Sequence, residues 1–70
     1  MIEEELRCTI IDENKKNIFV YSKRLCLLLK YVDFKDINLI EKIILCNFLN
    51  EIAYNIKIET ENITQILIKE

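Results

Sequence analysis

The sequence predicts a small α+β domain, and three observations support that prediction. Apolar residues alternate with polar ones towards both ends of the chain, as in half-buried strands. A long apolar stretch in the middle has the spacing of a helix that is buried on several sides. Polar segments rich in asparagine separate these stretches, as turns do. We therefore expect the order β-β-α-α-β-β, with two helices packed on an antiparallel sheet of two hairpins.

A β-hairpin is expected at the start of the chain. Residues 5–10 alternate between polar and apolar side chains, and residues 18–21 form a short β-branched and aromatic run. Residues 12–17 between them are polar and include two asparagines, which predicts the connecting loop.

A short helix is expected over residues 23–32. Ser22 is a suitable N-cap, and the apolar residues that follow it fall at helical spacing. A continued strand is the alternative, because Lys23 and Arg24 oppose the positive end of a helix dipole. With that strand the order becomes β-β-α-β-β with one central helix.

A core helix is expected over residues 37–53, where almost every side of the helix is apolar. Asp36 or Asn38 can cap its start, and Asn38 has capping-box spacing to Glu41. Asn55 is the expected stop, since asparagine replaces the missing glycine.

A second hairpin is expected to close the chain, with strands at residues 56–59 and 63–69 around a turn at residues 60–62. The chain has no Gly and no Pro, so asparagine must take over the tight turns. Positive φ angles are therefore expected among four asparagines, Asn14, Asn17, Asn55 and Asn62.

The missing residue types exclude most enzyme chemistry. Without glycine there is no phosphate-binding loop, and without histidine there is no imidazole base or His-containing zinc site. The spacing of Cys8, Cys26 and Cys46 matches no metal or redox motif, and we expect these thiols to be buried in the core. We expect a single domain over residues 1–70 that is not an enzyme and has no cofactor, metal or small-molecule substrate.

The N-terminus is acidic rather than basic and apolar, so no signal peptide is predicted. The longest apolar runs are too short to span a bilayer. A cytoplasmic location with reduced cysteines is the expectation. The richness in Ile, Asn, Lys and Glu is compatible with coding by a phage or another mobile element.

The chain carries more large apolar side chains than a small monomer covers easily: 28 of its 70 residues are Ile, Leu, Val or Phe. Assembly is a common solution for such scaffolds. We expect an interaction module, a self-associating regulator or inhibitor that forms a homodimer or docks on a larger protein. The candidate interface is aromatic and comprises Phe19, Tyr21, Tyr31 and Phe34.

Two alternatives remain open. The first is a DNA-binding regulator of winged-helix type, in which a basic cluster contacts phosphates beside the stacking face of Tyr21. The candidate phosphate contacts are Lys15, Lys16, Lys23 and Arg24. The net charge of −2 argues against this function. The second alternative is an accessory subunit of a hetero-complex.

Overall fold

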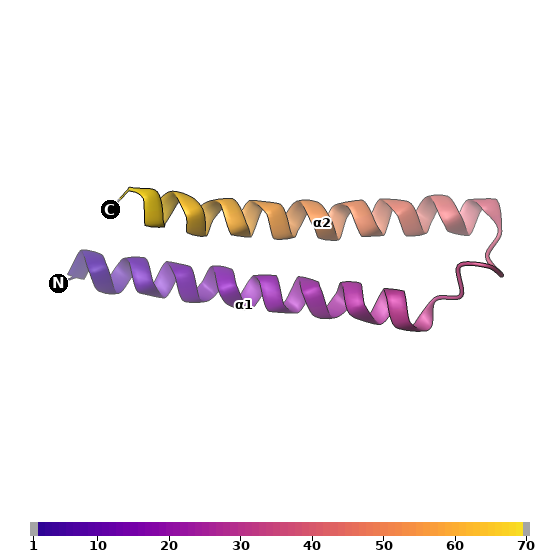
Figure 1. Cartoon of the computed structure of the whole chain (residues 1–70), viewed down its shortest axis with the longest axis horizontal. Helices are drawn as coiled ribbons and strands as arrows, with labels where there is room; N and C mark the ends of the chain where they lie inside the picture. The colour runs from indigo at the N-terminus through magenta and orange to yellow at the C-terminus, as the bar shows by residue number, and fades with distance from the viewer. Residues whose placement is uncertain (1, 70) are drawn as a thin grey trace.

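The computed structural model describes residues 2–69, with side chains from residue 3 onwards, as two antiparallel helices. Helix α1 spans Ile2–Tyr31 and helix α2 spans Leu39–Ile68, each of 30 residues. Residues 32–38 connect them. The two helices lie side by side along their whole length, which brings the two ends of the chain together at the end opposite the connector (Figure 1).

The expected α+β fold is wrong, in both the β-β-α-α-β-β and the β-β-α-β-β order. Residues 2–69 contain no strand, and the segments expected as strands (5–10, 18–21, 56–59 and 63–69) are all helical. The two expected helices exist as parts of α1 and α2. Isoleucine favours strands only weakly, and tertiary packing readily overrides that preference.

The two helices meet along a strip of residues spaced alternately three and four apart, here called the inner seam. This spacing repeats every seven residues and keeps one side of each helix turned towards the other. In α1 the seam consists of Arg7, Ile11, Asn14, Ile18, Tyr21, Leu25 and Leu28, all partly or fully buried, and the partly buried Val32 extends it into the connector. In α2 it consists of Leu45, Leu49, Ile52, Ile56, Glu59, Ile63 and Ile66. The seven-residue repeat runs through every segment that was expected to be a turn.

The polar segment 12–17 is helical, and its side chains divide between the inner seam and the exposed surface of α1. Asn14 lies in the inner seam, while Asp12, Lys15 and Lys16 are exposed. Asparagine costs an interior helix position only about 0.7 kcal/mol relative to alanine, so one buried asparagine does not break the helix. No residue in the described part of the chain has positive φ, so the expected left-handed asparagines are wrong at all four positions.

The segment 60–62 is not a turn, and Asn55 does not end the helix. The hydroxyl of Thr60 donates to the carbonyl of Ile56 at 2.7 Å, and that of Thr64 donates to the carbonyl of Thr60 at 2.9 Å. These bonds satisfy both hydroxyl groups inside the helix. Helix α2 therefore continues to Ile68.

Asn38 caps the start of α2, as the sequence predicts. Its side-chain oxygen accepts a hydrogen bond from the backbone N–H of Glu41 at 2.8 Å. Ser22 is not a cap, because α1 begins twenty residues earlier, at Ile2. Lys23 and Arg24 therefore lie in the second half of α1, far from the positive end of the helix dipole.

The connector ends α1 without a glycine. The carboxylate of Asp33 accepts a hydrogen bond from the backbone N–H of Lys35 at 2.9 Å, and the carbonyl of Asp33 accepts one from the N–H of Asp36 at 3.3 Å. An aspartate that bonds the backbone two residues on is a local turn motif. The chain thus reverses with right-handed or extended dihedrals throughout.

The hairpin is long and thin, and it buries little. Its extents are 55 × 17 × 12 Å and its radius of gyration is 16.3 Å, against about 11 Å for a compact chain of this length. The chain exposes 6004 Å², whereas a compact monomer of 8.4 kDa exposes about 4,600 Å². Leu45 and Ile52 are the only apolar side chains classed as buried in the described part.

The inner seam is expected to carry most of the stability. Ile52 is 8% exposed and Ile40 is 69% exposed, so these two residues of α2 allow the same substitution to be compared at a buried and at an exposed position. We expect Ile52→Ala to lower the free energy of unfolding by about 2 kcal/mol or more, because it leaves a cavity in the seam. Ile40→Ala should change it by less than about 0.5 kcal/mol. Urea unfolding followed by circular dichroism measures both, and equal effects would contradict the seam.

Candidate interaction surface

A groove runs along one side of the hairpin next to the connector. Its volume is about 670 Å³, and Leu27 and Tyr31 of α1 line it together with Phe48 and Ile52 of α2. A smaller hollow of about 240 Å³ continues it towards the connector and shares Val32 and Phe48 with it. The groove exists because the two seams touch along one line and their flanking side chains diverge.

The residues that flank the inner seam on this side repeat every seven positions and are here called the groove face. Eight of the seventeen exposed large apolar side chains belong to it, against five on the opposite side of the seam. The apolar members are Leu6, Ile10, Val20, Leu27, Tyr31, Ile44, Phe48 and Ile58. A heptad strip that is partly apolar and faces solvent is typical of a helix that contacts a further helix.

One charge of each sign lines the groove. Arg24 approaches the ring of Tyr21, with its guanidinium carbon 5.7 Å from the ring centroid. Glu51 lines the groove from α2. The groove therefore has no strong charge of either sign, and a highly acidic or highly basic partner has no electrostatic advantage there.

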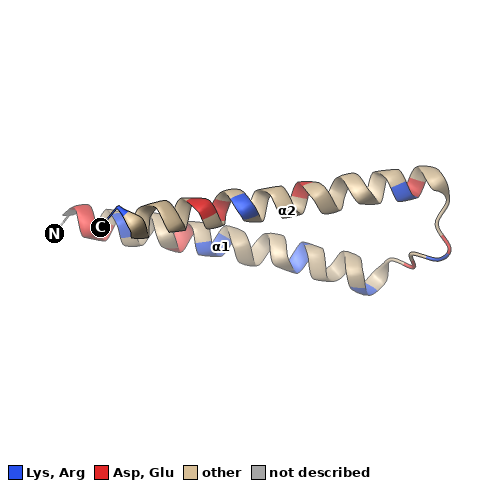
Figure 2. Ribbon diagram, turned by 45° about the horizontal axis from the view of Figure 1, so that its top comes forward, with Lys and Arg blue, Asp and Glu red and all other residues tan. Residues whose placement is uncertain are grey.

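The exposed apolar side chains gather near the connector. Twelve of the seventeen lie between residues 18 and 54, here called the connector half. The rest of the described chain, residues 2–17 and 55–69, is called the terminal half. The terminal half holds seven of the eleven described acidic residues. In α1, all charged residues beyond residue 14 are basic (Figure 2). Exposed apolar side chains are thus concentrated in the connector half, and acidic side chains in the terminal half.

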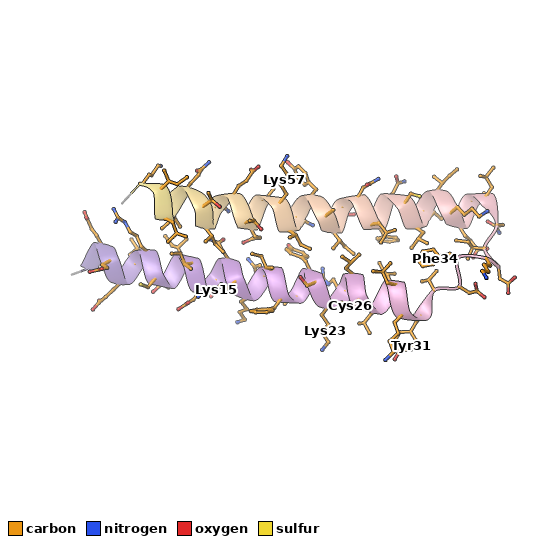
Figure 3. All side chains as sticks on the ribbon, viewed as in Figure 1. Lys15, Lys23, Cys26, Tyr31, Phe34 and Lys57 are labelled. Carbon is orange, nitrogen blue, oxygen red and sulfur yellow. The ribbon has the colours of Figure 1, made fainter. Side chains whose placement is uncertain are left out.

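The structure distributes the four expected interface aromatics over three places. Tyr21 and Tyr31 both line the groove, and Tyr31 projects from the outer edge of α1 and forms the rim (Figure 3). Phe19 is 74% exposed and lies beside a different hollow on α1. Phe34 is exposed in the connector. The sequence reasoning missed Phe48 and Leu27, which a seven-residue repeat would have placed beside the tyrosines.

The four candidate phosphate contacts do not form one cluster. Lys15, Lys16 and Lys23 surround a shallow hollow on the outer side of α1, together with Asp12. Arg24 lies in the groove. Lys23 projects away from α2 (Figure 3). The C-terminal hairpin expected as the wing of a DNA reader is part of α2.

The expected burial of the cysteines is wrong. Cys8, Cys26 and Cys46 are free thiols and are all exposed. The reason is again the helical repeat, because none of the three falls on the inner seam. Within residues 2–69 there is no group of three or more His, Cys, Asp or Glu side chains that could hold a metal ion. In the same range, neither helix is long and apolar enough to cross a membrane.

Three polar side chains, Arg7, Asn14 and Glu59, interrupt the seam in the terminal half, and the last two have a buried atom without a partner. Asn14 is 7% exposed, and its amide nitrogen has no hydrogen-bond partner among the described residues. The Oε2 atom of Glu59 is likewise buried without a partner there. A buried polar group without a partner costs about 1–3 kcal/mol. The terminal half of the seam is therefore weaker than the connector half.

Comparison with known proteins finds no matching family, no matching curated protein and no matching solved structure.

Removing the buried amide should stabilise the hairpin. We expect Asn14→Leu to raise the free energy of unfolding by about 1 kcal/mol or more, because an apolar group replaces a buried amide nitrogen that has no partner. The exposed Asn47 provides the control, and Asn47→Leu should change the stability by less than about 0.5 kcal/mol. Thermal unfolding at fixed protein concentration measures both. A lower stability of the Asn14 variant would show that the amide is satisfied in solution.

Proposed function

We propose that this protein is a non-enzymatic interaction module that works by self-association, and that its basic unit is a homodimer. The observation that carries the proposal is the apolar surface that two helices leave uncovered. The exposed area exceeds that of a compact monomer of the same mass by about 1,400 Å². Monomeric soluble proteins rarely expose large contiguous apolar patches.

The excess area matches what a stable dimer needs. A specific protein–protein interface buries about 800 Å² on each partner. The groove face and the connector half together hold 15 of the 17 exposed large apolar side chains that could contribute to this area. Two helices also cannot surround a core, whereas four helices can, and this makes the four-helix bundle a common architecture for hairpins.

A second copy of the chain is the partner that the charges favour. A two-fold interface brings each patch against its own copy, so a patch of a single sign would repel itself. The groove carries one positive and one negative side chain, Arg24 and Glu51, and is self-complementary in charge. The exposed thiols suit a reducing compartment, and we include a cytoplasmic location in the proposal.

The role of the dimer in this proposal is that of a regulator or inhibitor that presents its outer helix surfaces to a larger protein. The surface chemistry supports a binding role over a catalytic one. The groove is lined mainly by apolar and aromatic side chains, which provide contact area for a partner.

Sedimentation equilibrium tests the self-association. We expect a mass of twice 8.4 kDa at micromolar concentration and near-physiological salt. Because the association buries apolar area, raising the salt concentration should not dissociate the dimer. A single species of 8.4 kDa at all concentrations up to about 100 μM, well above the dissociation constants of specific complexes, would contradict the proposal.

A further inference from the structure

We infer that the two copies pack groove face to groove face, with both connectors at the same end, into a four-helix bundle. This inference rests on the proposed self-association and specifies its geometry. In this arrangement α1 of each chain lies against α2 of the second copy, and every helix has two antiparallel neighbours.

The register within one chain determines which residues would meet. Val32 and Leu45 line the same hollow at the connector end, so we take this pair as the starting point from which positions along α1 and α2 are counted. Both helices rise by about 1.5 Å per residue. A residue of α1 and a residue of α2 that are the same number of residues away from this pair therefore lie at the same height along the helix axes. A two-fold axis parallel to the helices preserves height. Each groove-face residue of α1 then meets the groove-face residues of α2 at its own level in the second copy.

In the connector half and at its border, this register places apolar groove-face side chains opposite apolar ones. Leu27 lies within one turn of Phe48 of the second copy, and Val20 lies level with Ile58. Between these two apolar levels, Arg24 lies within one turn of Glu51 of the second copy. Apolar side chains therefore cover each other, and the two groove charges pair across the interface.

The opposite orientation, with the connectors at opposite ends, loses this match. Full overlap would lay the apolar connector half of one chain on the charged terminal half of the other. Overlap of the connector halves alone would shorten the contact to about half of the 55 Å length. Buried apolar area is the main driving force for association, so the orientation with aligned connectors is favoured.

A pair of aromatic substitutions tests which face is the interface. Phe48 lies in the groove face and Phe19 lies on the opposite side, and both are more than half exposed. We expect Phe48→Lys to weaken dimerisation by about tenfold or more, because it places an unpaired charge in an apolar contact. Phe19→Lys should change the dissociation constant by less than about threefold, which corresponds to about 0.6 kcal/mol. Helicity measured by circular dichroism confirms that both variants fold.

A charge exchange and a distance measurement test the register. Arg24→Glu and Glu51→Arg should each weaken the dimer, and the double variant should recover most of the loss. A spin label attached to Lys35→Cys, in a background whose native cysteines are changed to serine, reports the distance between the two connectors. Aligned connectors predict a separation of about 20–30 Å, roughly the width of a four-helix bundle built at helix spacings of about 10 Å.

The possible outcomes separate the inference from the proposed function. A monomeric wild-type chain contradicts both. A wild-type dimer that Phe19→Lys disrupts and Phe48→Lys leaves intact keeps the function and overturns the geometry. A label separation of more than about 50 Å, near the length of a 30-residue helix, shows opposed hairpins with full overlap and also overturns the geometry. Opposed hairpins that overlap only in their connector halves bring the connectors to about half of the 55 Å length, so a second label at the exposed Glu5→Cys is needed for that case. This position lies about 40 Å from the connector, and its label separation should stay at roughly 20–30 Å with aligned connectors and reach about 50 Å with half-overlapped, opposed ones.

Discussion

The inner seam between α1 and α2 is the contact on which the rest of the structure depends. Two isolated helices in water gain little from propensity alone, and most of their stability comes from burying an apolar strip. Leu45 and Ile52 are buried there, and Val32 lines a hollow together with Leu45 while Leu28 lines the groove together with Ile52. Because the strip repeats every seven residues, it also decides which side chains remain outside. The exposed cysteines, the lysine-lined hollow and the groove face all follow from it.

The same contact leaves a large part of the apolar surface of the hairpin uncovered. One seam uses one side of each helix, yet the connector half is apolar on several sides, with Leu27, Leu29 and Phe48 all exposed. In a hairpin of two helices, each helix contacts the other through one side only, so a second apolar strip on either helix stays exposed. The uncovered strip lies on the groove side, and its chemistry is mixed enough to accept a copy of itself.

Parts of this structure could be predicted from the sequence, and the rest failed for an identifiable physical reason. The Asn38 cap and the helical character of residues 39–53 were predicted correctly, since a cap and an all-round apolar stretch are local signals. The prediction of strands was wrong because apolar and polar residues that alternate over only four to six positions also fit a helix whose buried residues are spaced three and four apart. The seven-residue repeat becomes visible only over longer windows of sequence. Such windows have to include the polar residues Asn14 and Glu59, which interrupt the apolar pattern but occupy positions of the repeat. Tyr21 and Tyr31 were expected in an interface because they are aromatic, and both line the groove, whereas the place of Phe48 beside them required the register.

The uneven seam has a consequence for how the hairpin opens. Asn14 and Glu59 weaken the end that holds both termini, whereas the buried Leu45 and Ile52 lie towards the connector. Local opening follows such differences in buried contact. Thermal fluctuations should therefore unzip the chain from its free ends, while the short connector holds the apolar end closed. Backbone amides would then exchange with solvent in a gradient along each helix, slowest where the helices are joined.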